Sequence, residues 1–288
     1  MLPPDLPSTS AVSGWQASLS LRFAHRGTRS TLVENRHRGP LLVQRPLYPE
    51  GGVCHVVILH PPAGIAGGDE LEIGITVEDG AHAVLTTPGA TRWYKSGGRA
   101  AAQRVTLCVA TGARLDWLPQ ENILFNDARA QITTHLTVAP GASALGWDAV
   151  VLGRQTSGET WTGGTLRLAT HITAGSRALW IEQAQLDAGS PLRTAAVGLD
   201  GLGVMGTLWA VGAGATQALA ETLAARLPDR ADLRAGVTRF AEAGHSMLLL
   251  RVIGAEMEAV RHIMVAAWTA LREPMHGVAA RPLRLWAT

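Results

Sequence analysis

The sequence has little of several features that define common protein classes. It contains two cysteines, Cys54 and Cys108, so at most one disulfide can form, and reduced thiols in a cytosolic protein are the simpler interpretation. Only 17% of the residues are charged and the arginines are scattered singly, which excludes a basic stripe for nucleic acid. No apolar run reaches the roughly 18 residues of a membrane helix, and residues 1–14 lack the segments of a signal peptide. These absences favour a cytoplasmic protein.

The signatures of common enzymes are also missing. The sequence has no H-E-x-x-H, C-x-x-C, G-x-S-x-G or G-x-x-x-x-G-K-[ST] motif. Gly201, Gly203 and Gly206 do fit the G-x-G-x-x-G pattern of a dinucleotide site. However, residues 207–211 have the composition of a strand at the place where that motif requires a helix. Glycines in a turn are the better interpretation, and we expect no catalytic activity.

From residue 15 to about residue 210 the hydrophobic pattern is typical of β-strands. Apolar and polar residues alternate in short runs, and this period of two places one set of side chains on a buried face. The clearest runs are Leu19, Leu21 and Phe23; Leu71, Ile73, Ile75 and Val77; and Val105, Leu107 and Val109. Turn residues such as those at 140–141 and 163–164 separate the runs. The pattern predicts one domain over residues 15–288, preceded by a flexible tail over residues 1–14.

Two helices are predicted in the C-terminal third. Residues 214–227 are rich in Ala, Leu and Glu and end before Pro228. Residues 254–273 place apolar side chains at helical spacing before Pro274. Between them, residues 246–253 are an apolar strand candidate. The predicted fold class is therefore mainly β, a β-rich single domain of sandwich or helical β architecture with two α-helices.

The segment from His60 to Asp69 is the most unusual local motif. Its three glycines give the backbone freedom and present Asp69 and Glu70 at the start of a strand. Together with Cys54 and His55, these side chains are possible ligands for nickel, cobalt or zinc. Cys54 and His55 are adjacent on a strand and point to opposite faces, so they do not readily share one ion. For His55 alone, a structural histidine is the favoured interpretation.

Carboxylates beside large apolar residues form a second theme. Asp116 precedes Trp117, Asp148 follows Trp147, and Glu182 follows Ile181. A buried carboxylate is costly unless it is paired, hydrogen-bonded or bound to a cation. Each one alone is best interpreted as an outward-facing residue or as the partner of an arginine such as Arg92 or Arg154. Several in one chain, without an obvious local partner, suggest a polar path through the protein.

The sequence resembles the family of urease accessory proteins called UreD or UreH. The resemblance covers nearly the whole chain, apart from the segment before Trp15 and residues 212–245. The strings that carry it are residues 39–51, 60–69, 86–96, 115–122, 152–154, 157–159 and 285–288. Ala63 stands where the family usually has Gly, and Trp93 where it usually has Phe. Both departures concern local backbone shape.

The resemblance implies a non-catalytic scaffold for urease maturation. Such a protein binds apo-urease and, with a UreF-type partner and a UreG-type GTPase, enables GTP-dependent insertion of nickel. The family has a proposed water-filled tunnel for nickel(II), and its polar positions fall here on Asp69, Glu70, Thr91, Asp148 and Glu182. No cofactor is expected to be bound permanently, and nickel is expected only in transit. The lack of a dense His and Cys cluster favours a conduit over a store.

Two other functions stay open from the sequence. The nine tryptophans fit either a core or a surface for partners, and a β-sandwich that binds glycans is one alternative. A metal-dependent hydrolase that uses His60, Asp69 and Glu70 is the other. Binding to glycans without urease would support the first alternative, and metal-dependent turnover lost in Asp69→Ala would support the second.

Overall fold

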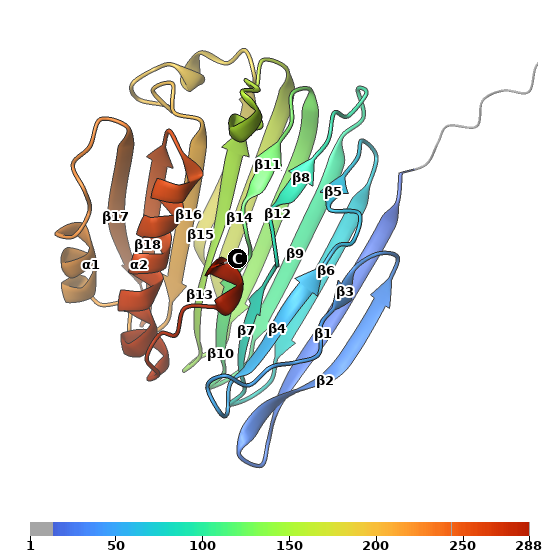
Figure 1. Cartoon of the computed structure of the whole chain (residues 1–288). Helices are drawn as coiled ribbons and strands as arrows, with labels where there is room; N and C mark the ends of the chain where they lie inside the picture. Colours follow the sequence, from blue (N-terminus) through green and yellow to red (C-terminus); the bar gives the residue numbers. More distant parts are fainter. Residues whose placement is uncertain (1–13, 243, 288) are drawn as a thin grey trace, which may run out of the picture.

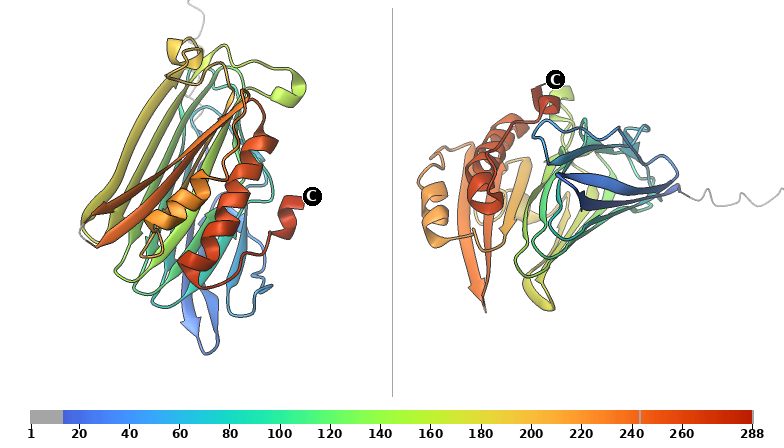
Figure 2. Two further views of the ribbon diagram at one scale, coloured as in Figure 1. Left: turned by 90° about the vertical axis from the view of Figure 1, so that its left-hand side faces the viewer. Right: turned by 90° about the horizontal axis from the view of Figure 1, so that it is seen from below.

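The protein is built from two β-sheets that face each other, with two α-helices on the outside of one of them (Figures 1 and 2). The computed structural model describes residues 14–242 and 244–287. The predicted tail over residues 1–14 therefore lies almost entirely outside the described residues. In the described part of the chain, no helix is both long and apolar enough to cross a membrane.

The first sheet has seven strands. In spatial order they are β15 (Arg177–Asp187), β14 (Gly164–Ala174), β12 (Ala128–Val138), β9 (Ala101–Val109), β6 (Glu70–Val77), β1 (Gln16–Arg26) and β2 (Arg29–Arg38). The five inner strands, β14, β12, β9, β6 and β1, pair in parallel. The outermost pairs, β14 with β15 and β1 with β2, are antiparallel. The sheet is therefore a parallel array closed by one hairpin at each edge.

The second sheet has eleven strands. Along its main path they are β17 (Leu233–Glu242), β18 (His245–Gly254), β16 (Val204–Val211), β13 (Ser143–Leu152), β10 (Arg114–Leu118), β7 (His82–Thr86), β4 (Cys54–Leu59) and β3 (Leu42–Val43). Three short strands complete it: β5 (Gly64–Ile65), β8 (Thr91–Trp93) and β11 (Asn122–Leu124). Its neighbouring strands β4, β7, β10 and β13 pair in parallel. From β13 outward, the pairs with β16, β18 and β17 are antiparallel.

The chain winds as a solenoid between the two sheets. It passes from β6 to β7, then from β9 to β10, then from β12 to β13, so that each coil contributes one strand to each sheet. Successive coils stack in register, with Ala102 opposite both Glu70 and Gln131. This confirms the predicted mainly β fold and its helical β alternative.

The core between the sheets follows from the alternation along each strand. In β12, for example, the residues with even numbers from Ala128 to Val138 are buried, and those between them are mostly exposed. The same alternation in β1, β6 and β9 buries the apolar residues that the sequence pattern selects. Six tryptophans are buried as well, which confirms a core role for most of them: Trp93, Trp117, Trp147, Trp161, Trp209 and Trp268.

The two helices are α1 (Gln217–Ala224) and α2 (Met257–His276), and both lie against the eleven-stranded sheet (Figure 2). Helix α1 begins three residues later than predicted, because the Thr216 hydroxyl caps its first turn by accepting from the Leu219 amide at 3.3 Å, and it ends three residues earlier, at Ala224. Helix α2 continues past the predicted end at residue 273. Pro274 lies in its last turn, and Gly277, with φ +68°, ends it. The extra residues carry His276 to the sheet.

Over residues 14–242 and 244–287 there are also three 3-10 helices: η1 (Gln155–Ser157), η2 (Pro191–Arg193) and η3 (Arg284–Ala287). The G-x-G-x-x-G segment leads into β16, as the sequence predicts, and not into a helix. Its last glycine, Gly206, lies under α2. A Cβ there would come within 2.9 Å of Val260 and 2.6 Å of Met264. Packing against α2, and not phosphate binding, explains this glycine.

Candidate functional site

The predicted site residues fall into three separate places in the structure. Asp69 is buried, and its two carboxylate oxygens accept backbone hydrogen bonds from Trp15 and Ala66, each at 2.8 Å. Those bonds join the start of β1 to the turn before β6. The neighbouring Glu70 lies on the outer face of the seven-stranded sheet, where it pairs with Arg104 at 3.4 Å. The two adjacent carboxylates therefore point to opposite sides of the sheet.

Thr91 begins β8 and borders a small pocket. The pocket has a volume of about 130 Å³ and also includes His60 and Gln103 in its lining. Burial lowers the pKa of His60, against an opposing effect of Asp69, so its imidazole is neutral at physiological pH. The pocket is thus lined by His60 and by the turn before Thr91. Asp148 and Glu182 are not among its lining residues.

Asp148 and Glu182 come together between the two sheets. Both belong to an inter-sheet polar layer, which consists of Asp148, Thr207 and Arg251 from the eleven-stranded sheet and Thr134, Thr170 and Glu182 from the seven-stranded sheet. The Thr134 hydroxyl donates to Asp148 Oδ2 at 3.3 Å, and Glu182 forms an ion pair with Arg251. The layer crosses an interior that is otherwise apolar.

The inter-sheet polar layer reaches the surface at one end. The side chain of Arg251 is 50% exposed and that of Glu182 is 24% exposed. Deeper in, Asp148, Thr170 and Thr207 are partly buried although they face inward, while Thr134 is almost fully buried. Water therefore has access to the layer from the side of β15 and β18, and exposure decreases toward Thr134.

Asp148 has an unusual electrostatic environment. Burial raises the pKa of its carboxyl to about 6, the nearby charge of Glu182 adds to the rise, and the hydrogen bond from Thr134 opposes it. Glu182 in the same layer forms an ion pair with Arg251 and accepts a hydrogen bond from the indole of Trp180 at 3.3 Å. Asp148 is the carboxylate of this layer without a basic partner.

A second polar cluster lies on the opposite face of the eleven-stranded sheet, under α2. Asp116 is its centre and is fully buried. The indole of Trp268 donates to Asp116 Oδ1 at 2.7 Å, His82 Nε2 lies 3.0 Å from Oδ2, and Arg272 Nε lies 3.4 Å from Oδ2. Burial alone would raise the pKa of Asp116, but His276, His82 and Arg272 hold it well below its ordinary value.

Glu50 and His55 extend this cluster. Arg272 Nη1 lies 2.7 Å from Glu50 Oε2, and His55 Nε2 lies 2.9 Å from Glu50 Oε1. Although burial opposes it, these contacts hold the pKa of Glu50 below its ordinary value. His55 is thus a buried structural histidine, in agreement with the sequence interpretation. Its neighbour Cys54 points into the core between the sheets, and both cysteines are free thiols.

Sequence reasoning found only part of this second cluster. It identified Asp116 beside a tryptophan and interpreted it as an outward-facing residue or as the partner of an arginine such as Arg92 or Arg154. Asp116 is fully buried, and its arginine partner is Arg272. It did not identify His82 or His276. The only available signal was a single histidine at a strand start and another after Pro274, and neither pattern distinguishes a cluster from an isolated side chain.

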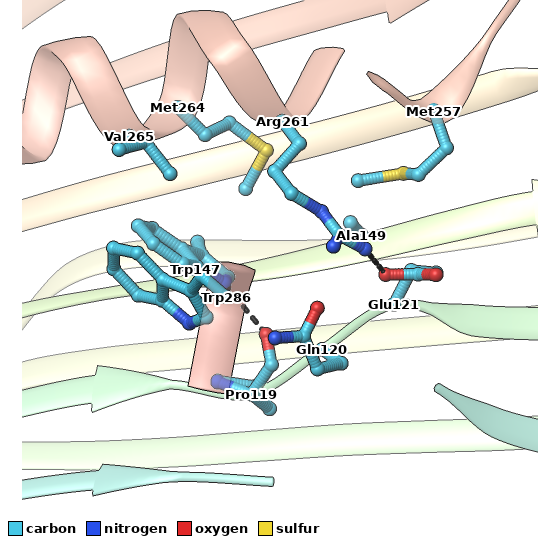
Figure 3. Close-up of a pocket in the computed structure, with 10 residues that line it drawn as sticks. All are labelled: Pro119, Gln120, Glu121, Trp147, Ala149, Met257, Arg261, Met264, Val265 and Trp286. Atoms are coloured by element: carbon cyan, nitrogen blue, oxygen red, sulfur yellow. Dashed lines mark hydrogen bonds and ion pairs between the residues drawn. The ribbon is translucent and has the colours of Figure 1, made fainter. Parts of the chain in front are cut away.

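A small apolar pocket separates α2 from the C-terminal segment (Figure 3). The ring of Trp286 in η3 lies 5.5 Å from that of Trp147 and 5.4 Å from that of Trp268, measured between centroids. Beside them Arg261 of α2 forms an ion pair with Glu121 (Figure 3). The space enclosed is about 10 Å³, which suits one water molecule and no larger ligand. These contacts hold the end of the chain against the sheet.

Comparisons with known proteins give a consistent result. The sequence model of the family described as UreD urease accessory protein matches residues 16–287. Among curated proteins, the chain is 71% identical to a urease accessory protein UreD of Cupriavidus necator, over 99% of both chains. It is 68% identical to the one of Cupriavidus pinatubonensis, again over 99% of both chains. It is 58% identical to the one of Ralstonia nicotianae, over 99% of this chain and 98% of the relative.

The family model and the curated relatives both cover nearly the whole chain, including residues 212–245, where the sequence resemblance is weak. The chain belongs to the UreD family of urease accessory proteins.

Proposed function

We propose that this protein is a non-catalytic scaffold that passes nickel(II) to apo-urease. The observation that supports the proposal most directly is the inter-sheet polar layer. It places two carboxylates and three hydroxyls across an apolar interior, with decreasing exposure from Arg251 at the surface to Thr134 inside. Such a layer gives an ion a polar route where an ordinary β-sandwich has only apolar side chains.

The chemistry of the layer suits passage more than storage. An ion in transit needs ligands that replace part of its hydration shell but do not hold it. Oxygen ligands bind nickel(II) more weakly than imidazole or thiolate does. Asp148 and Glu182 supply the oxygens, and the sulfur ligand Cys54 is buried away from them, with the hydroxyl of Tyr48 at 3.7 Å. In this proposal the ion exchanges between carboxylate, hydroxyl and water ligands.

Among the five predicted nickel positions, Asp148 and Glu182 have the strongest support. Thr91 and His60 border a second pocket that could receive or release the ion. Asp69 accepts two backbone hydrogen bonds and Glu70 faces outward. We therefore propose that Asp69 stabilises the turn before β6 and that Glu70 attracts cations at the surface. Asp148 would then be the main ligand for nickel inside the protein.

We further propose that the protein works in a complex in the cytoplasm. Its partners are the structural subunits of urease, a UreF-type accessory protein and a UreG-type GTPase, which together insert nickel in a GTP-dependent step. The support is that its relatives are named as urease accessory proteins. No permanently bound cofactor is needed for this role.

Urease maturation with site variants tests the proposal. Urease subunits and the accessory proteins are co-expressed with this chain carrying Asp148→Asn, Glu182→Gln or both, and the nickel in purified urease is measured. Glu72→Gln is the matched control, because it also replaces a carboxylate with an amide, but at an exposed position of β6 on the outer face and outside the proposed route. We expect lower nickel occupancy with Asp148→Asn, lower still with the double variant, and unchanged pull-down of the partners. Full nickel occupancy with the double variant would refute the conduit.

A further inference from the structure

Three potential metal ligands converge on the outer face of the eleven-stranded sheet. His82 begins β7, Asp116 lies in β10, and His276 is the last residue of α2. His82 Nε2 is 3.0 Å from Asp116 Oδ2, and His276 Nε2 is 3.7 Å from Asp116 Oδ1. One ligand atom from each residue lies within 4.8 Å of the others, and all three residues are buried.

Two buried polar atoms beside these residues lack a hydrogen bond within the described part of the chain. They are Arg272 Nη2 and His276 Nε2. Glu50 Oε1 and His55 Nε2, by contrast, lie 2.9 Å from each other as an ion pair. Native proteins leave few buried polar groups unpaired, and each of them calls for an explanation such as a bound ion. His276 Nε2 is the one that points at Asp116.

The cluster contains two buried carboxyl groups, Asp116 and Glu50. Among the described residues, Arg272 is the only guanidinium that forms an ion pair with either of them. Their other charged or titratable contacts are imidazoles, His55 with Glu50 and both His82 and His276 with Asp116. A cation bound between His82, Asp116 and His276 would be a further buried partner for Asp116.

The orientation of His276 is fixed by its other ring nitrogen. Ser143 Oγ lies 2.8 Å from His276 Nδ1, so that Nε2 is directed toward Asp116. Metal-bound histidines characteristically have such a partner on the second nitrogen. His276 and Ser143 also line a pocket of about 470 Å³ formed by the turns at that end of the sheets. The pocket gives an ion a route from solvent to the cluster.

We propose that His82, Asp116 and His276 bind one divalent cation of the zinc class, which locks the end of α2 to the sheet. Two imidazole nitrogens and one carboxylate oxygen, with water as a fourth ligand, are a donor set that zinc takes in tetrahedral sites. With bonds of about 2.0–2.1 Å, ligand atoms in a tetrahedron lie about 3.4 Å apart. The distances of 3.0 and 3.7 Å in the cluster lie on either side of this value. Arg272 keeps its contacts with Glu50 and with the Ala279 carbonyl.

This site is independent of the proposed nickel route. Asp116 faces α2, whereas Asp148 faces the seven-stranded sheet, so the eleven-stranded sheet separates the two carboxylates. Two buried imidazole ligands, one of them held in place by Ser143, suit an ion that stays bound. The inter-sheet polar layer offers mainly oxygen ligands, which suit an ion that passes through. A resident ion would hold α2 and the C-terminal segment in place.

Metal binding by the full chain tests this inference. The protein is stripped with a chelator, dialysed, and titrated with Zn(II) or Co(II), with metal content and the visible spectrum of Co(II) as readouts. The variants are His82→Asn and His276→Gln, which keep polar side chains of similar size. The control is the double variant His135→Asn/His171→Gln, which removes two histidines from the outer face of the seven-stranded sheet, where their rings lie 4.8 Å apart. A second control is Asp148→Asn.

We expect one Zn(II) per chain, the intense visible bands of tetrahedral Co(II), and a higher Tm with metal than after chelation. Affinity should fall about tenfold or more in His82→Asn and His276→Gln and stay unchanged in both controls. Binding that survives both site variants, or that is lost only in the surface-histidine control, would overturn the site. If the site variants do not fold, the wild type decides: the absence of a tetrahedral Co(II) spectrum and of a metal-dependent Tm refutes the inference.

Discussion

Asp148→Asn should make the protein more stable and less able to mature urease. The aspartate lies in the inter-sheet polar layer, where burial raises the pKa of its carboxyl to about 6 from the ordinary 3.8. Its ionised form is therefore disfavoured in the folded protein. The asparagine keeps the size of the side chain and an oxygen for the Thr134 hydroxyl, but it carries no charge. The substitution removes the cost of burying the charge.

The size of the effect follows from the shift in pKa. A difference from 3.8 to about 6, at about 1.36 kcal/mol for each pH unit, corresponds to at most about 3 kcal/mol. Because Asp148 is only partly buried and water screens it in part, we expect about 1–3 kcal/mol. The raised pKa means that the folded state holds the proton more tightly. The contribution of Asp148 is therefore fully present below about pH 4 and lost as the pH rises through about 6.

Unfolding experiments at two pH values measure this effect. At pH 8 we expect Asp148→Asn to exceed the wild type in free energy of unfolding, with a Tm higher by several degrees at about 2–4 °C per kcal/mol. At pH 4 the two proteins should be nearly equal. Glu70→Gln, on the exposed outer face, should differ from the wild type by less than about 0.5 kcal/mol at both pH values. An Asn variant that is less stable at pH 8, or a difference independent of pH, would refute this reasoning.

Three further predictions concern structural residues. Asp116→Asn should lower the free energy of unfolding at neutral pH by about 1–3 kcal/mol in urea titrations, because it removes the buried charge that Trp268, His82 and Arg272 contact and leaves Glu50 as the remaining carboxylate partner of Arg272. Asp69→Asn should lower it by about 1–3 kcal/mol in the same assay and speed proteolysis near the start of β1, since two charge-assisted backbone bonds weaken. Gly206→Ala should lower the Tm through about 1–3 kcal/mol of overpacking under α2, whereas Gly236→Ala, with free space around its Cα, should not.

Local patterns predicted the elements of this fold better than their arrangement. The alternation in β1, β6 and β9 identified strands and their buried faces. The winding was not visible, because the coils share a shape without sharing a repeated sequence. Parallel pairing between β6 and β9 depends on backbone hydrogen bonds and apolar contacts that many residues can make. A sequence without repeats therefore predicted a sandwich or a helical β fold without choosing between them.

The candidate sites show the same limit. Asp148 and Glu182 stood out because a carboxylate beside an aromatic residue in a strand needs a partner. The partner of Glu182 is Arg251, which comes from β18 and follows 69 residues later in the sequence. His82 and His276 are even farther apart along the sequence. They come close in space because α2 extends past Pro274. Sites assembled from distant elements leave no spacing for a sequence motif to reveal.

The two central carboxylates differ in the partners that surround them. Asp116 receives an indole, two imidazoles and a guanidinium, and these partners lower the pKa of its carboxyl. Asp148 receives one hydroxyl, and burial raises its pKa to about 6. Unfavourable buried groups of this kind are typically retained where function requires them, which supports the proposed role of Asp148. In the proposed conduit, a carboxylate without a basic partner, reached by water between two sheets, would meet a passing cation, whereas the paired carboxylate would not.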